Sequence, residues 1–212
     1  MMKIRRIAEE LKKHSPFTFI GALSGIAVAL LFRTVSSDTA YSLFYVFHPT
    51  HVVLSALVTA SLYRIKKRHT EKKTVNVWAL LLIGYTGSIG IATLSDSIIP
   101  FIGELLLDLP NKGVHLGFIE EWWLVNPLAL AGVAIAYFVP RTRFPHAGHV
   151  LVSTWASTFH ILMASDRNMP VGYYFVAFVF LFIAVWIPCC VSDIVFPLMF
   201  VKTEANRRHD AH

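Results

Sequence analysis

Six long apolar stretches run through the sequence and leave little chain for anything outside a membrane. They cover residues 15–32, 48–63, 75–100, 122–139, 145–164 and 171–201. A transmembrane helix needs about 20 mainly apolar residues. Apolar side chains make up 55% of the 212 residues and charged ones only 15%, too few for an ordinary water-facing surface. The sequence therefore predicts an all-α integral membrane protein with six transmembrane helices.

Basic residues gather in alternate loops, and this predicts the orientation of the six helices. Of the 19 Lys and Arg residues, all but Arg33, Lys112 and Arg167 lie before the first stretch, between the second and third, between the fourth and fifth, or after the sixth. The other loops carry acidic residues, among them Asp38 and Glu104. Because cytoplasmic loops are rich in Lys and Arg, both termini are expected in the cytoplasm.

The charge pattern also predicts a location and argues against one class of partner. We expect a multi-pass protein of the plasma (inner) membrane, with residues 1–14 as a cytoplasmic amphipathic lead-in and residues 202–212 as a cytoplasmic tail. The net charge of +6 does not indicate nucleic-acid binding, because the basic residues lie between the apolar stretches rather than on one polar face. The lipid bilayer is the expected partner, and a homo-oligomer is compatible with it.

Three motifs occur twice in the same order. "SPFTFIGALSGIAVALLFR" in the first stretch resembles "NPLALAGVAIAYFVPR" in the fourth, "HPTHVVLS" resembles "HAGHVLVS", and "LSDSIIP" resembles "VSDIVFP". A unit of three spans ends on the opposite side of the membrane from its start, so its second copy enters upside down. The sequence therefore predicts two inverted three-helix repeats (3+3), formed by residues 15–104 and 105–201.

Each repeat carries polar residues along one face of its second helix. The first copy has His48, His51, Ser55 and Thr59, and the second has His146, His149, Ser153, Ser157 and then His160. Spacings of three and four residues put them on one helical face. Lipid cannot satisfy such a face, so it must meet other helices or water. Close packing of small residues is an alternative role for the serines and the threonine.

Two aspartates lie inside apolar stretches, where a carboxylate costs roughly 2.5 to 3.5 kcal/mol and needs a partner. We expect Asp96 near the outer end of its helix with His48 and His51, and Asp193 near the inner end with the second histidine pair. His160 would lie between these two half-sites.

Imidazole and carboxylate ligands suit Zn²⁺, Mn²⁺, Fe²⁺, Co²⁺ or Ni²⁺. The predicted metal ligands are His48, His51, Asp96, His146, His149, Asp193 and His160. The residues predicted to line a pathway are Ser55, Thr59, Ser95, Ser153, Ser157, Ser192, Cys189 and Cys190. A proton relay without metal, and purely structural hydrogen bonding, are alternatives for the histidines, as packing is for the cysteines.

These patterns predict a transporter or channel for a divalent transition-metal ion, with its path between the two repeats. An intramembrane zinc-dependent hydrolase is one alternative, but it needs a single compact site with an open coordination position, and the ligands divide into two sets. A proton-coupled small-solute permease with histidines as titratable gates is another. A haem-bearing electron carrier is a third.

Overall fold

The computed structural model describes residues 2–71, 74–165, 170–190 and 196–201, and every regular element in these ranges is a helix. The elements are α1 (Met2–Leu31), α2 (Ser37–Glu71), α3 (Val77–Thr93), the π-helix η1 (Leu94–Ile98), α4 (Ile99–Leu106), α5 (Gly117–Glu120), α6 (Trp122–Phe138), α7 (Arg143–Ala164), α8 (Val171–Cys190) and α9 (Phe196–Met199). The predicted all-α class is confirmed for these residues.

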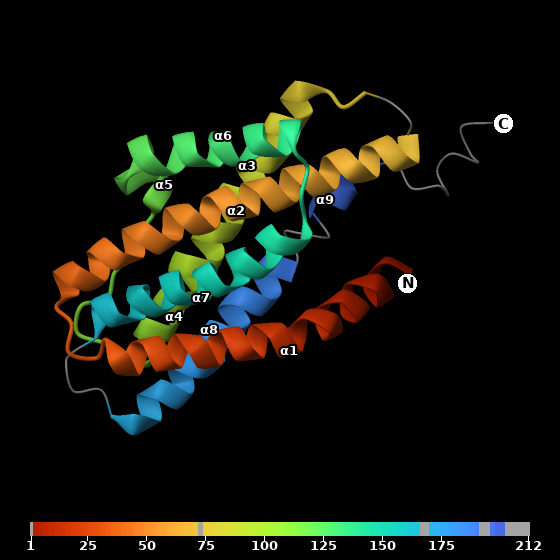
Figure 1. The fold of residues 1–212 in the computed structure, drawn as a ribbon. Helices are drawn as coiled ribbons and strands as arrows, with labels where there is room; N and C mark the ends of the chain where they lie inside the picture. Colours follow the sequence, from red (N-terminus) through yellow and green to blue (C-terminus); the bar gives the residue numbers. More distant parts are fainter. Residues whose placement is uncertain (1, 72–73, 166–169, 191–195, 202–212) are drawn as a thin grey trace.

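Four helices lie side by side in the order α6, α2, α7, α1, with α2 and α7 in the middle (Figure 1). The other long segments cover this row: α3 packs against α2 and α6, and α8 packs against α1 and α7. Helix α2 runs antiparallel to α7, since Ser37 at its start donates a hydrogen bond to the carbonyl of Met163 near the end of α7 (2.9 Å). The polar faces predicted for these two helices therefore lie against each other.

Among the residues that the structure describes, three helices are long and apolar enough to cross a membrane, and they span Ser37–His69, Val77–Leu106 and Val171–Cys189. The apolar helices Ser15–Leu31 and Trp122–Phe138 are shorter. Helix α7 is long, but the polar face that it presents to α2 lowers its overall hydropathy. Six spans and their inverted arrangement accordingly stay predictions.

Two predicted boundaries are wrong, and both errors concern where a helix ends. Helix α2 begins at Ser37, eleven residues before the predicted start of the second span, so Asp38 lies in its first turn rather than in a loop. The third span does not stop at residue 100, because α4 continues it to Leu106. Glu104, predicted as a loop residue, is therefore helical and fully buried.

The third span contains a local change of helix type that brings polar residues inward. Leu94–Ile98 forms a π-helix, in which the backbone N–H of Ile99 donates to the carbonyl of Leu94, five residues earlier. Pro100 has no N–H and its ring would clash with the carbonyl of Asp96, four residues before it. The motif S-D-x-x-x-P thus places a proline where it disrupts the α-helix at the aspartate. Ser95, Asp96 and Ser97 are all fully buried.

Candidate metal centre

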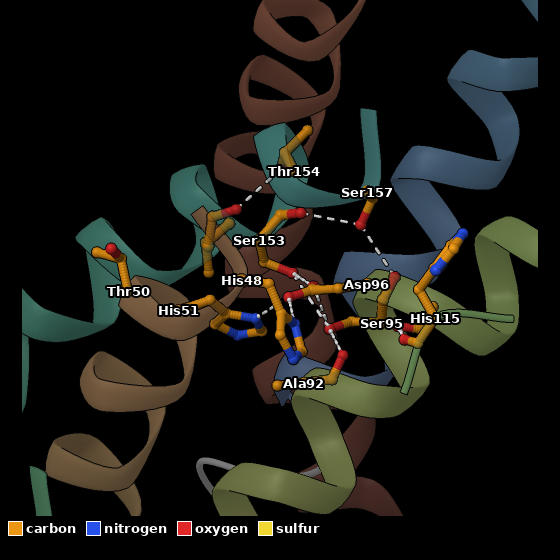
Figure 2. Close-up of polar contacts among 12 residues, drawn as sticks. His48, Thr50, His51, Ala92, Ser95, Asp96, His115, Ser153, Thr154 and Ser157 are labelled. Atoms are coloured by element: carbon orange, nitrogen blue, oxygen red, sulfur yellow. Dashed lines mark hydrogen bonds and ion pairs between the residues drawn. The ribbon is translucent and has the colours of Figure 1, made fainter. Parts of the chain in front are cut away.

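Asp96 lies at the centre of the facing polar helices and accepts four hydrogen bonds (Figure 2). Its Oδ2 atom is 2.9 Å from Nδ1 of His48 and 2.8 Å from Nδ1 of His51. Its Oδ1 atom accepts from the hydroxyls of Ser95 (2.7 Å) and Ser153 (2.8 Å). A carboxylate only accepts, so each imidazole carries its hydrogen on Nδ1. We call these five residues the Asp96 cluster.

The hydrogen bonds of the Asp96 cluster join three elements, namely α2, η1 and α7. Ser157, one turn beyond Ser153 on α7, adds a contact to the backbone of η1, because its hydroxyl donates to the carbonyl of Ser95 (2.9 Å). All residues of the cluster are at most 1% exposed. In such surroundings hydrogen bonds are strong and an unpaired charge is costly, so the donors hold the carboxylate in one orientation.

A second group of side chains lies next to His51. The ring of His149 stacks on that of His51, with centroids 5.6 Å apart and an angle of 7° between the planes. One ligand atom each of His51, His149 and Cys189 lies within 4.8 Å of the other two, and all three residues are buried. Among the described residues, Nε2 of His51 has no hydrogen-bond partner. We call these three residues the His–Cys group.

The structure brings together some of the predicted site residues and separates others. His48, His51 and Asp96 meet as expected. The prediction of two half-sites at opposite faces is wrong for His149, which stacks directly on His51. The physical reason is the early start of α2. Its additional turns place His51 in the middle of the helix, level with His149 on the antiparallel α7.

His160 does not lie between two half-sites. Its Nδ1 is 2.6 Å from Oε1 of Glu104, toward the other end of α7. Glu104 was not predicted as a site residue, since the third span was predicted to stop before it. His115, in the segment between α4 and α5, was not predicted either. A useful signal was present, because the sequence after Pro100 stays apolar up to Leu107 with Glu104 as its one ionisable residue.

The remaining predicted residues divide between buried positions and positions outside the described part. Ser55 and Thr59 are fully buried on the same face of α2 as the two histidines. The residues outside the described part are Ser192 and Asp193, together with the side chains of His146 and Cys190.

Near the end of the bundle, Glu120 links α2 to the segment that precedes α5. It accepts a hydrogen bond from the hydroxyl of Tyr45 (2.7 Å), and Nδ1 of His115 is 3.1 Å away. Partial burial raises the pKa of the Glu120 carboxyl, but the hydrogen bonds from Tyr45 and His115 outweigh it, so the net pKa lies below the ordinary value.

Comparison of the chain with protein-family models, with curated proteins and with solved structures gave no match. The functional argument therefore depends on the geometry of the buried polar residues.

Proposed function

We propose that the protein transports a divalent transition-metal ion across the membrane and that the His–Cys group binds the ion on its way. The observation that carries this proposal is the convergence of three buried ligand atoms, from α2, α7 and α8, within 4.8 Å. Imidazole nitrogen and cysteine thiolate are the common protein ligands of Zn²⁺. Three side chains also leave a fourth coordination position open, through which an ion can exchange.

Asp96 supports this role without being a ligand itself. Its oxygens already accept four hydrogen bonds, one of them from Nδ1 of His51. Metal-binding histidines almost always donate their other ring N–H to a carboxylate, a carbonyl or water, which fixes the tautomer and raises the basicity of the ligand nitrogen. In this arrangement Nε2 of His51 is the nitrogen that meets the metal.

The ligand set narrows the range of ions. Among the candidates considered from the sequence, a thiolate favours Zn²⁺ over the harder Mn²⁺. We therefore propose Zn²⁺ as the first ion to test, with Co²⁺, Fe²⁺ and Ni²⁺ as competitors. His48 and Asp96 would orient the site, and Ser55 and Thr59 would continue its polar face along α2.

We also propose that six helices cross the membrane as two inverted repeats, which place the ion path between α2 and α7. Matched contacts support this architecture. Gly25 and Gly132 begin the shared run G-[IV]-A-[VI]-A. A methyl group on Gly25 would lie 2.8 Å from Thr154, and one on Gly132 would lie 2.8 Å from Ala56. Thr154 and Ala56 each follow the stacked histidine of their helix by five residues. Equivalent residues thus contact equivalent residues of the other half.

An intramembrane zinc-dependent hydrolase is the second candidate, and one observation favours it. The ligands converge on one compact site with an open position, which is what such an enzyme needs. It also needs a base near the metal-bound water. The carboxylate beside the site, Asp96, is already occupied by four hydrogen bonds, so transport fits the geometry better.

The test is Zn²⁺ uptake into vesicles that contain the purified full-length protein. The variants His51→Ala and His149→Ala should each lower the initial rate by about tenfold or more, because each removes one of three ligands. His69→Ala is the matched control, since His69 is an exposed histidine at the end of the same helix as His51.

Two results would argue against transport. Unchanged Zn²⁺ uptake in both His51→Ala and His149→Ala would refute the proposed ion-binding site. One tightly held zinc per chain, with no exchange during uptake, favours the hydrolase instead.

A further inference from the structure

The bundle buries a second ionisable pair outside the Asp96 cluster. His160 of α7 is 1% exposed and Glu104 of α4 is fully buried. Nδ1 of His160 lies 2.6 Å from Oε1 of Glu104. Ionisable residues inside a membrane protein are costly and usually serve a function. The His–Cys group does not include this pair, so the pair calls for a role of its own.

The two buried carboxylates differ in how well they are satisfied. Asp96 accepts four hydrogen bonds of 2.7 to 2.9 Å. Glu104 accepts one short hydrogen bond from His160 and a longer one, 3.3 Å, from the backbone N–H of Gly113. A carboxylate that accepts few hydrogen bonds can take up a proton and still stay hydrogen-bonded to its partner, here the imidazole of His160.

His160 has one nitrogen without a hydrogen bond among the described residues. Its Nδ1 faces Glu104, while Nε2 is buried and has no partner there. A buried polar atom without a hydrogen-bond partner destabilises the fold. Protonation at Nε2 would change the charge of the ring without breaking the bond to Glu104.

A partly exposed histidine lies next to this pair. The ring centroid of His115 is 5.4 Å from that of His160, and its side chain is 27% exposed. His115 in turn contacts Glu120, whose side chain is 33% exposed. Further titratable groups reach the pair through its neighbours. Tyr41 and Glu120 contact His115, Tyr45 donates a hydrogen bond to Glu120, and His48 stacks on Phe44, whose ring meets His160. Helix α8 presents Phe180 to the turn of α4 at Gly103.

We propose that Glu104 and His160 form a proton-binding site, supplied through His115, and that protons bound there drive the metal transport proposed above. The coupling rests on that proposed function, whereas the proton site itself does not.

The pair takes up one proton in this step, through two proton transfers, and no electron moves. A proton reaches Nε2 of His160 from the side of His115, and the ring passes its Nδ1 proton to Oε1 of Glu104. The products are a neutral carboxylic acid and a neutral imidazole with its hydrogen on Nε2. Release reverses the two transfers.

Two contacts connect the proton site to the Asp96 cluster. The ring of Phe44 stacks on His48 (5.0 Å between centroids) and meets His160 edge-on (5.5 Å). The hydroxyl of Ser97, next to Asp96 in η1, donates to the carbonyl of His115 (2.5 Å). A change in the charge of the Glu104–His160 pair therefore acts on α2 through Phe44 and on η1 through His115, while Phe44 keeps His48 and His160 apart.

An infrared pH titration of the full-length protein in lipid bilayers, without added metal, tests the proton site directly. Over the range in which histidine titrates, roughly pH 5 to 8, the wild type should gain the C=O band of a protonated carboxyl. The band should be absent in Glu104→Gln. In His160→Gln it should appear at a different pH from that in the wild type. Glu121→Gln, which removes a neighbouring carboxyl, is the control. A band that persists in Glu104→Gln, or the absence of a band in the wild type, overturns the proposal.

Zn²⁺ accumulation in vesicles tests the coupling. For one proton per ion, a pH difference of one unit should change the steady-state accumulation ratio about tenfold. Glu104→Gln should abolish this dependence, while Glu121→Gln should keep it. A dependence that survives in Glu104→Gln overturns the coupling. If vesicles with the wild-type protein take up no Zn²⁺, both the transport proposal and the coupling are refuted. The infrared titration then tests the proton site by itself.

Discussion

Asp96 shows at the scale of one residue how a carboxylate is kept inside an apolar bundle. Two imidazoles and two hydroxyls share its oxygens, and they come from α2, α7 and η1. Removal of one partner from a buried, hydrogen-bonded pair leaves the others unsatisfied, which costs far more than the pair contributes when intact.

Replacement of Asp96 by Asn should therefore destabilise the protein and weaken metal binding. The amide presents N–H groups where the carboxylate accepts hydrogen bonds, so we expect a loss of about 3 to 5 kcal/mol in unfolding free energy. Zinc affinity should fall about 10- to 100-fold, because His51 loses the group that orients it. Denaturant unfolding in micelles and calorimetric zinc titration measure the two effects. Asp108→Asn is the control, since Asp108 is exposed and asparagine tolerates its positive φ of 50°.

Glu120 predicts a dependence of stability on pH at the edge of the bundle. Its pKa is lower in the folded state than in the unfolded chain, so it stabilises the fold above its unfolded pKa of about 4.3. This contribution is lost as the pH falls through the folded pKa. Glu120→Gln should thus lower the melting temperature more at neutral pH than at about pH 3. Equal losses at both pH values would contradict this, and Glu121→Gln serves for comparison.

Sequence reasoning succeeded for single residues where spacing alone was decisive. Spacings of three and four placed His48 and His51 on one face, and the cost of a buried charge predicted Asp96 as their partner. The same reasoning could not place Cys189 beside His51, because that contact depends on how α8 packs against α7. It also missed Glu104, which lies beyond the proline taken as the end of the third span.

At the scale of elements, η1 explains why the motif S-D-x-x-x-P carries a proline. Pro100 prevents a regular α-helix around Asp96, and the wider turn leaves Ser95, Asp96 and Ser97 buried together. Single turns of π-helix often occur at functional sites for this reason.

Substitution of Pro100 by Ala should restore the missing backbone donor and favour a regular α-helix. Asp96 would then rotate away from His48 and His51, and zinc affinity should fall although helix propensity rises. Calorimetric zinc titration and circular dichroism together measure the change. Pro127→Ala, at an exposed proline of α6, is the control and should leave zinc affinity unaltered. Unchanged affinity in Pro100→Ala would mean that the proline does not position Asp96.

Glycines at the helix contacts give a second prediction at this scale. A methyl group on Gly132 would lie 2.5 Å from the backbone oxygen of Val53. Gly132→Ala should destabilise the protein by about 1 to 3 kcal/mol, because α6 must move away from α2. On α3, a methyl group on Gly90 would meet nothing within 4 Å. Gly90→Ala should therefore be neutral or stabilising by up to about 1 kcal/mol. Thermal unfolding compares the two, and equal effects would show that the α2–α6 contact is not close.

Helix boundaries were the least predictable elements. The second span was predicted to start at residue 48, where histidine and proline follow one another. The structure instead carries α2 through Pro49 from Ser37. Contacts with other segments stabilise these first turns: Phe44 packs against α7, and Tyr45 reaches Glu120. No local pattern in the sequence reports such contacts.

For the whole molecule, the proposed six spans make a prediction about sidedness. Single cysteines at Lys12, Lys66 and Arg141 should react with a membrane-impermeant maleimide from one side, and cysteines at Arg33 and Lys112 from the other. All five positions are exposed, and Cys189 and Cys190 are first replaced by alanine. Labelling of Lys66→Cys and Lys112→Cys from the same side would refute the six-span arrangement.

The sequence predicted more of the whole molecule than of its details. Repeated motifs predicted that the second helix of each half would carry the polar face, and the structure places α2 against α7. They could not predict that these faces join into one site, because the depth of each histidine depends on the true helix ends.

The position of α1 has a consequence for synthesis. Helix α1 packs chiefly against α7 and α8, which follow it by more than a hundred residues (Figure 1). At a synthesis rate of about 5 to 20 residues per second, several seconds pass between the synthesis of α1 and that of α7 and α8. During that interval Ser24 lacks the hydrogen bond that it later accepts from the indole of Trp155 (3.2 Å). Helix α1 is thus synthesised well before the two helices that hold it in place.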